Sequence, residues 1–229
     1  MDKTLLNIPL VMDGLDLLDF TLDGSVSCCI FDPQYRQILD KLKFGNEGER
    51  QKKRALLKQM DVSVIQNFIH GIHKVLIPSS YLFLWCDKFI VAEGLHKQFF
   101  ETVNSNEFTN MSLVDMIVWD KQSFGMGKRS RRTNEYLLVY QKIPKTTLNW
   151  TDKGIRDTWS EKIIKPRDGH PHRKPMGLTK RLIECVTKEG DIVIDPCAGS
   201  FSTLKVCKKI NRNFIGCDLT GEYIDEDLR

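Results

Sequence analysis

The amino-acid sequence predicts an α/β protein with a mostly parallel sheet. Apolar runs of strand length alternate with segments of helical periodicity along most of the chain. The chain has 229 residues, of which 41% are hydrophobic, which is enough for one large domain with its own core. Two of the predicted strands end in the dipeptide Asp-Pro, at Asp32 and Asp195. Because ligands bind beyond the carboxyl ends of the strands in such sheets, we expect the functional site at that edge.

Helices are predicted where apolar residues recur every three or four positions. The segments with this pattern are residues 14–24, 62–78, 89–104, 177–190 and 203–211. In the first segment the recurring residues are Leu15, Leu18 and Leu22. Pro78 and Gly190 are expected to end the second and the fourth segments.

Strands are predicted where apolar and β-branched residues run together between turn residues. These runs are residues 26–31, 80–86, 113–121, 135–142, 191–195 and 213–219. The third and fourth runs are expected to form a hairpin around the basic stretch GMGKRSRR. Residues 36–60 and 143–172 lack periodicity, so we expect loops there, with a frayed helix as the alternative for the first of them.

Positive charge is concentrated in three segments of a chain whose formal net charge is only +4. These segments are residues 41–58, 121–132 and 162–181. Basic segments usually form solvated surface, but three of them in one chain favour a face that binds nucleic acid. The seven cysteines lie mostly in apolar runs without a C-x-x-C pair, and no apolar run reaches transmembrane length. We therefore expect a reduced, cytosolic protein with no membrane partner.

The stretch DIVIDPCAGSFSTLKVCKKINRNFIGCD is typical of a strand, a small-residue turn, a helix and a second strand. Small residues let backbone N–H groups approach a ligand at a helix N-terminus, and Asp218 at the second strand end could accept hydrogen bonds from ribose hydroxyls. The pattern indicates a nucleoside-containing cofactor and leaves open whether this is a dinucleotide or S-adenosylmethionine. A nicotinamide enzyme would need a G-x-G-x-x-G turn, which the sequence lacks. In the alternative without a cofactor, Asp195 only caps the turn and Asp218 lies on the surface.

Three stretches together resemble the β-class DNA amino-methyltransferases. The stretch from HPHRKPMGLTK to FIGCDLTGEY resembles that family's H-P-x-x-K-P segment followed by D-P-F-x-G-S-G-T-T and R-x-F/Y-I-G-x-E. The stretch DGLDLLDFTLDGSVSCCIFDPQY is similar to G-D-x-L…S-V-D-x-I-x-x-D-P-P-Y, and MIVWDKQSFGMGKRSRRTNEYLLVYQK to a W-x-K segment, an Arg-rich turn and a Glu-led strand. The resemblance implies one Rossmann-like methyltransferase domain over residues 1–229, with helices on both faces of the sheet. It also implies a circularly permuted motif order, in which the catalytic tetrapeptide precedes the cofactor loop.

In this family the tetrapeptide, here Asp32-Pro33-Gln34-Tyr35, acts on a base that has left the double helix. The resemblance implies that the Asp32 carboxylate and the Pro33 carbonyl accept hydrogen bonds from the target amine, and that Tyr35 stacks on the base. It implies no metal. The residues expected around S-adenosylmethionine are Asp13, Lys174, Pro175, Asp195, Cys197, Ala198, Gly199, Ser200, Ser202, Thr203 and Asp218.

The same resemblance implies double-stranded DNA as the substrate. The residues expected to contact its phosphates are Lys52, Lys53, Arg54, Lys128, Arg129, Arg131 and Arg132. A small target-recognition insertion is expected at about 143–169, between the Glu-led strand and the H-P segment. The habits of the family further imply a bacterial or phage cytoplasm, a homodimer and a cognate restriction endonuclease.

The sequence departs from the family pattern at three positions. Gln34 replaces the usual third proline of the tetrapeptide, which leaves both expected acceptors in place. Phe201 replaces a glycine of the cofactor loop, and Cys197 replaces a phenylalanine. If the glycine position requires a positive φ, Phe201 is strained there. We also hypothesise an exchange of size, in which Phe201 fills the room that Cys197 leaves.

Asp32 favours the N6 amine of adenine as the target, because cytosine-N4 relatives more often begin the tetrapeptide with serine. Cytosine-N4 methylation is the enzymatic alternative. A catalytically weak DNA-binding module is the alternative from another class, since Gln34 and Phe201 both depart from the pattern. Binding of S-adenosylmethionine would separate the enzyme from the module.

Overall fold

The computed structural model describes residues 5–34, 60–101, 110–125, 129–162, 173–222, 224 and 226–228. The helices and strands of these residues are, in chain order, β1 (Leu10–Val11), α1 (Gly14–Phe20), β2 (Val26–Phe31), α4 (Val62–Val75), β3 (Leu76–Cys86), α5 (Lys88–Ala92), the 3₁₀ helix η2 (Leu95–Phe100), β4 (Met111–Asp120), β5 (Asn134–Lys142), β6 (Thr158–Ser160), α6 (Met176–Val186), β7 (Ile192–Asp195), α7 (Ser202–Lys209), β8 (Asn213–Asp218) and the 3₁₀ helix η3 (Glu226–Leu228).

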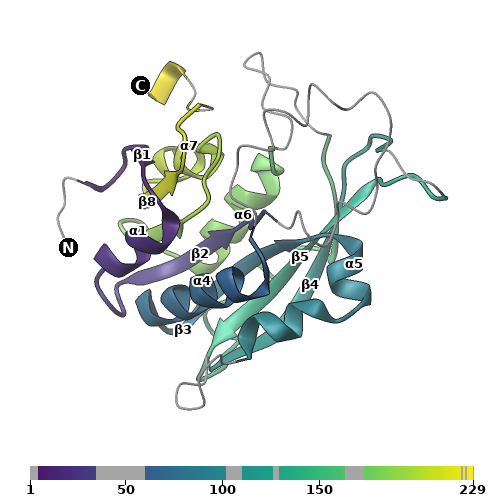
Figure 1. Ribbon diagram of the computed structural model, residues 1–229, viewed down its shortest axis with the longest axis horizontal. Coiled ribbons are helices and arrows are strands. Elements are labelled where there is room, and N and C mark those ends of the chain that lie inside the picture. The colour runs from purple at the N-terminus through teal and green to yellow at the C-terminus, as the bar shows by residue number, and fades with distance from the viewer. Residues whose placement is uncertain are drawn as a thin grey trace.

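The strands of the described residues form one sheet in the order β1-β8-β7-β2-β3-β5-β4-β6 (Figure 1). Neighbouring strands run parallel except where β5 pairs with β3 and with β4. The antiparallel pair β4 and β5 is the predicted hairpin, and the other connections cross over through longer segments, as parallel pairs require. The predicted α/β fold with a mostly parallel sheet is therefore confirmed.

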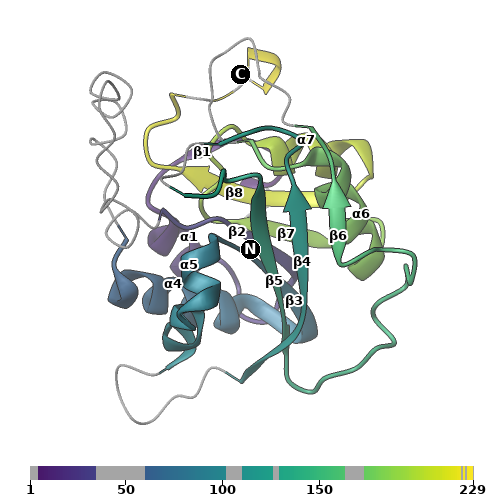
Figure 2. The same cartoon turned by 90° about the vertical axis from the view of Figure 1, so that its right-hand side faces the viewer.

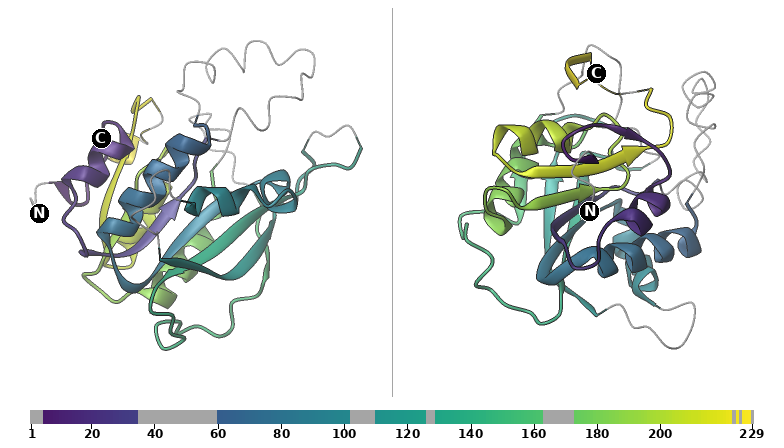
Figure 3. Two further views of the ribbon diagram at one scale, coloured as in Figure 1. Left: turned by 60° about the horizontal axis from the view of Figure 1, so that its bottom comes forward. Right: turned by 90° about the vertical axis from the view of Figure 1, so that its left-hand side faces the viewer.

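Helices cover both faces of this sheet. The alternation of side chains along β2 divides the core, because Cys29 and Phe31 face α1 and α4 whereas Cys28 and Ile30 face α6 and α7. Figure 1 shows α4 and α5 on the near face, and Figure 2 shows α6 and α7 on the opposite side of the strands. Figure 3 shows α1 lying beside α4, which it contacts over the end of the sheet that carries β8.

Several predicted helices end earlier than the sequence indicated. The second one stops at Val75 rather than at Pro78, because β3 begins at Leu76 and pairs there with β2. Residues 89–104 are divided into α5 and η2 by Gly94, whose φ of 70° interrupts the helix. In α1 two of the three predicted apolar residues face the core, since Leu18 is buried and Leu15 is partly buried, whereas Leu22 lies beyond the end of the helix at Phe20 and is exposed. Pairing and local backbone geometry, rather than periodicity, set these ends.

Two short strands were missed. β1 has two residues and β6 has three, and each is defined by its neighbour in the sheet rather than by a pattern of its own. β6 lies in the segment predicted to be loop, where Trp150 and Trp159 also pack against the core. The described part of this segment is therefore fixed to the sheet. None of the helices in the described ranges is long and apolar enough to cross a membrane.

Candidate functional site

The carboxyl ends of four parallel strands meet at one edge of the sheet. Asp32 follows β2, Asp195 ends β7 and Asp218 ends β8, and these three strands are neighbours. β1 pairs with β8 in a register that sets Val11 opposite Asp218, so that Asp13 follows at the same edge. The topology thus brings together the acidic residues that the sequence predicted for the catalytic and cofactor sites.

The Asp195 carboxylate is held by its own turn. One of its oxygens accepts a hydrogen bond from the Cys197 amide at 3.2 Å, and the other accepts from the Thr203 hydroxyl at 2.7 Å. Burial raises the pKa of Asp195 to about 7 against these two hydrogen bonds, and the nearby carboxylates of Asp32 and Asp218 add to the rise. Asp195 is therefore a buried acid whose charge depends on the pH near neutrality.

Phe201 adopts a left-handed backbone conformation, as predicted for the glycine position that it occupies. Its φ is 56° and its ψ is 33°, and it occupies the position that precedes α7. The expectation of backbone strain is confirmed, because a residue with a side chain costs about 1–2 kcal/mol in this region. The ring is completely buried, and it packs edge to face on Phe214 with 6.3 Å between the ring centroids. Burial of the ring offsets the strain.

The hypothesis of a size exchange is wrong. Phe201 belongs to the core on the α6 and α7 face of the sheet, whereas Cys197 packs against the core on the α1 and α4 face. The two side chains therefore point to opposite sides of the sheet, and the ring cannot fill space beside Cys197.

Asp218 and Gly14 shape the neighbouring part of the edge. The Oδ1 atom of Asp218 accepts hydrogen bonds from the amides of Thr220 and Gly221, and no described residue donates to its Oδ2 atom. A Cβ atom on Gly14 would collide with the carbonyl oxygen of Pro196. The start of α1, capped by the Asp13 carboxylate, therefore packs directly on the turn that follows β7.

Asp32 lies in a chain of four alternating charges. The Lys174 ammonium contacts the Oδ2 atom of Asp32 at 3.0 Å and the Oε2 atom of Glu135 at 2.8 Å. Lys121 contacts the other carboxylate oxygen of Glu135 at 3.3 Å. The Lys174 ammonium also lies 5.1 Å from the centroid of the Trp85 ring. The Asp32 side chain is still 35% exposed, so it remains within reach of a substrate.

The pKa values of this chain follow from burial and from the neighbouring charges. Burial raises the pKa of Asp32, the Lys174 ammonium opposes the rise, and the Glu135 carboxylate adds to it. Burial alone would lower the pKa of Lys174, but the two carboxylates outweigh it and raise that pKa above its ordinary value. Lys174 is therefore a permanent positive charge beside Asp32.

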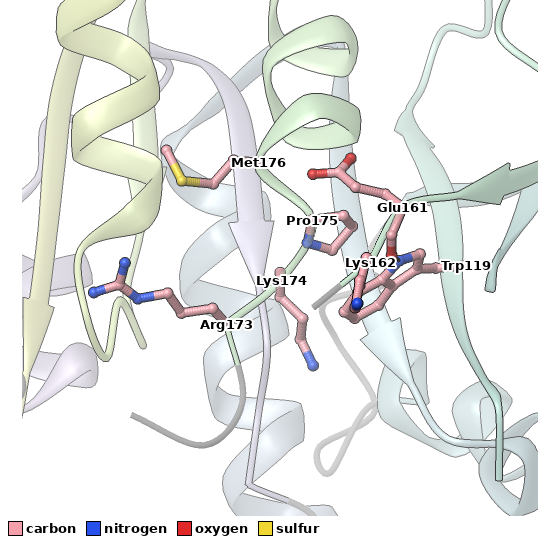
Figure 4. Close-up of a pocket in the computed structure, with 7 residues that line it drawn as sticks. All are labelled: Trp119, Glu161, Lys162, Arg173, Lys174, Pro175 and Met176. Carbon is pink, nitrogen blue, oxygen red and sulfur yellow. Dashed lines mark hydrogen bonds between the residues drawn. The ribbon is translucent and has the colours of Figure 1, made fainter. Parts of the chain in front are cut away.

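The segment that carries Lys174 is fixed by a distant capping residue. The helix α6 begins after Pro175, which has no side chain that could cap it. Glu161 supplies the cap, because its carboxylate accepts from the amides of Gly177 at 3.0 Å and Leu178 at 3.2 Å. Figure 4 shows Glu161 beside the first turn of α6, while Lys174 extends away from the helix. These residues border a small cavity of about 40 Å³.

The predicted DNA contacts are only partly described. Arg129 and Arg131 are exposed beside the tip of the β4–β5 hairpin, whereas Arg132 is half-buried with its guanidinium 5.5 Å from the Phe89 ring centroid. Phe124 on the same hairpin is 87% exposed. The predictions for Tyr35, Lys52, Lys53, Arg54 and Lys128 lie outside the described residues.

Sequence reasoning assigned no role to four residues that build this site. They are Trp85, Lys121, Glu135 and Glu161. A signal existed for two of them, since Lys121 ends the W-x-K segment and Glu135 leads the strand that followed it in the family pattern. Trp85 and Glu161 carried no such signal, because their roles depend on which strands become neighbours. Lys174, for which a cofactor contact remains a prediction, makes ion pairs with Asp32 and Glu135.

Comparison with known proteins gives concordant results. Residues 26–228 match the family model described as DNA methylase. The chain is 49% identical over 211 residues to the Type II methyltransferase M.HhaII of Haemophilus parahaemolyticus, a match that covers 91% of this chain and 89% of that protein. It is 39% identical over 90 residues to the DNA adenine methyltransferase YhdJ of Escherichia coli (strain K12), which covers 39% of this chain and 28% of that protein. The crystal structure of the M1.HpyAVI–SAM complex has a TM-score of 0.63 at 21% identity, covering 94% of this chain and 95% of that one, and confirms the predicted fold.

Proposed function

Because the chain belongs to the DNA methylase family, we propose that it transfers a methyl group from S-adenosylmethionine to the N6 amine of adenine in double-stranded DNA. The observation that carries the proposal is the Asp32 carboxylate, which is partly exposed at the end of β2 beside the turn of Asp195. Aspartate at this position favours adenine over cytosine. The relative YhdJ, which is named a DNA adenine methyltransferase, supports the same base.

The residues at the ends of β7 and β8 fit S-adenosylmethionine. The Oδ2 atom of Asp218, to which no described residue donates, can accept from ribose hydroxyls. The close packing of Gly14 on Pro196 places the start of α1 against the Asp195 turn, where a residue with a side chain would collide with the Pro196 carbonyl oxygen. The carboxylates of Asp13, Asp195 and Asp218 make the surroundings negative, which favours a cofactor with a positively charged sulfur.

The reaction needs help for a weak nucleophile. The lone pair of the adenine amine is delocalised into the ring, and Asp32 and the Pro33 carbonyl would accept hydrogen bonds that favour a localised pair on nitrogen. S-adenosylmethionine bound at the ends of β7 and β8 would supply a methyl group, whose carbon would bond to N6 while the sulfur keeps the electron pair of the broken bond. Positive charge grows on N6 until one of its protons leaves for solvent. The Asp32 carboxylate opposes that charge, so its hydrogen bond strengthens toward the transition state.

The proposed DNA contacts lie on the β4–β5 hairpin. Arg129 and Arg131 are the exposed cations of its described part, and they would contact phosphates. The exposed ring of Phe124 on the same hairpin offers a flat face to a base. We propose target recognition for residues 143–169 as well. A homodimer, a cognate restriction endonuclease and a bacterial cytoplasm belong to the same proposal.

The experiment that tests this function identifies the modified base. Purified protein is incubated with methyl-labelled S-adenosylmethionine and unmethylated genomic DNA, which is then digested to nucleosides. We expect the label in N6-methyladenine, and a loss of about 10²–10³-fold in rate for Asp32→Asn, the magnitude found when one stabilising group is removed from an active site. Asp23→Asn is the matched control, because Asp23 is an exposed carboxylate before the other end of β2.

Two outcomes would overturn the proposal. Label in N4-methylcytosine would replace adenine by cytosine as the target. Label in neither base, from folded protein that binds S-adenosylmethionine, would refute the catalytic function and favour a DNA-binding module.

A further inference from the structure

The Lys174 ammonium makes ion pairs with Asp32 and Glu135, but the proposed reaction uses only Asp32. It lies 3.0 Å from Asp32 and 2.8 Å from Glu135, over the face of Trp85. An ammonium has three N–H donors, so it can serve both carboxylates at once. The Lys174 side chain is only 17% exposed and the Glu135 side chain 23%, so these pairs are weakly screened by solvent.

The contact of Lys174 with Asp32 resembles the hydrogen bond that the target amine is proposed to make with Asp32. In both cases a nitrogen donates an N–H to the same carboxylate. While Lys174 holds the Oδ2 atom of Asp32, an incoming amine finds that atom already engaged. An amine that uses this oxygen would therefore have to displace the ammonium or share the oxygen with it.

Glu135 can keep the Lys174 ammonium paired after it leaves Asp32. Its carboxylate is anchored by Lys121 at 3.3 Å, and the Lys121 side chain is only 13% exposed. Lys174 can thus lose its contact to Asp32 and still remain paired. Without such an anchor, a buried ammonium that left Asp32 would be unpaired, which is costly.

We infer that Lys174 holds the acceptor position of the target amine on Asp32 until DNA binds, and that Glu135 is the positioning residue that retains Lys174 when the amine replaces it. This inference rests on the proposed function. After the exchange Asp32 keeps its negative charge for the growing positive charge on N6. Lys121, Glu135 and Lys174 remain as a chain beside it.

The two positioning residues act on Asp32 with opposite signs. The Lys174 ammonium favours the ionised carboxylate, and the Glu135 carboxylate favours the protonated one. Among the described residues, the other titratable groups that face Asp32 are Asp195 and Cys197 of the turn after β7. These groups are unchanged in variants of Lys174 and Glu135, so a shift in the titration of Asp32 reports on the pair alone.

The experiment measures kcat against pH at saturating cofactor and DNA. We expect Lys174→Met to move the acidic limb of the profile to higher pH and Glu135→Gln to move it to lower pH. We also expect Glu135→Gln to lower kcat about tenfold in the wild-type background but less than about twofold in Lys174→Met, since contacting residues couple by such amounts. In Lys174→Met there is no ammonium that Glu135 has to retain when the amine binds Asp32, so the loss of Glu135 should matter less.

Matched controls come from the same chain. Lys180 and Glu184 form an exposed ion pair on α6 at 3.8 Å, and Lys180→Met and Glu184→Gln should leave the acidic limb in place. Lys174→Arg keeps the positive charge and should keep the wild-type limb. If Lys174→Met does not fold, Lys174→Gln provides the same comparison.

The outcomes separate this inference from the proposed function. Suppose that the wild-type protein methylates adenine, but that the acidic limbs of Lys174→Met and Glu135→Gln move in the same direction or do not move. This result would overturn the inference and leave the proposed function standing. An equal loss of kcat on Glu135→Gln in both backgrounds would also overturn it. The titration of Asp32 can be followed by carbon-13 NMR of its carboxyl carbon, so opposite shifts can be measured even in a protein that transfers no methyl group.

Discussion

Two neighbouring strands of this protein end in the same dipeptide, and the two aspartates are stabilised in different ways. Asp195 at the end of β7 accepts hydrogen bonds from Cys197 and Thr203, which belong to its own turn and the helix that follows. Asp32 after β2 is paired with Lys174, which comes from the segment before α6 and is anchored by Glu135 of β5. The turn at Asp195 is built locally, whereas the surroundings of Asp32 are assembled from distant segments.

The difference corresponds to the two tasks in the proposed function. A cofactor turn has to keep one shape, and local hydrogen bonds provide that. Asp32, which is proposed to bind the amine of an incoming nucleobase, needs an ion-pair partner that can be displaced. Ion pairs contributed by other elements can be exchanged without unfolding the turn. The comparison predicts that substitutions within the turn itself disrupt the site at the end of β7. The site at the end of β2 should instead be disrupted by substitutions in the distant segments that supply its ion pairs.

The largest effect on stability is expected at Phe201 in the local turn. Removing the buried ring costs about 3–5 kcal/mol, while relieving the left-handed backbone returns about 1–2 kcal/mol. Phe201→Gly should therefore lower the free energy of unfolding by about 1–4 kcal/mol. Phe201→Ala keeps the strain and should be about 1 kcal/mol less stable than Phe201→Gly. Urea denaturation of both variants measures this order, and a less stable glycine variant would show that the backbone is not strained.

The next effect is a pH dependence that arises from Asp195. Its pKa is about 7 in the folded protein and near 3.8 in the unfolded chain, so between these values the folded state binds more protons. The contribution of Asp195 to stability is therefore largest at low pH and is lost as the pH rises through about 7. From pH 5 to pH 8 the protein without cofactor should lose about 1–3 kcal/mol more than Asp195→Asn does. Chemical denaturation at the two pH values checks this, and equal losses would mean that Asp195 is already ionised at pH 5.

The same contrast explains what the sequence could predict. The Asp195 turn is contiguous in sequence, so its motif indicated Thr203 and Asp218, and even the strain at Phe201 followed from one missing glycine. The strands and helices with strong periodicity, such as α4 and β2, were predicted for the same reason. The pairing of Lys174 with Asp32 depends on how the strands are ordered in the sheet, which no local pattern contains. The capping of α6 by Glu161 likewise joins segments that only the folded sheet brings together.

The smallest predicted effect tests a distant contact of the β2 end. Glu161 caps α6 directly after the segment that carries Lys174, and it also accepts a hydrogen bond from the Trp159 indole at 2.7 Å. Glu161→Ala removes these acceptors and should cost about 1–2 kcal/mol of unfolding free energy, as the loss of a helix cap does. Glu184→Ala, at an exposed position of the same helix, is the control and should cost less than about 0.5 kcal/mol.

The comparison of the two strand ends also predicts where the loss of Glu161 is felt in function. Loosening the start of α6 displaces Lys174 and leaves the turn of Asp195 intact, since that turn takes its hydrogen bonds from Cys197 and Thr203. Glu161→Ala should therefore lower kcat by a larger factor than it weakens the binding of S-adenosylmethionine. Titration calorimetry and initial rates on the same preparation measure both quantities. A variant that loses cofactor affinity but keeps its kcat would mean that the start of α6 supports the β7 end, and the division between a local and an assembled strand end would not hold.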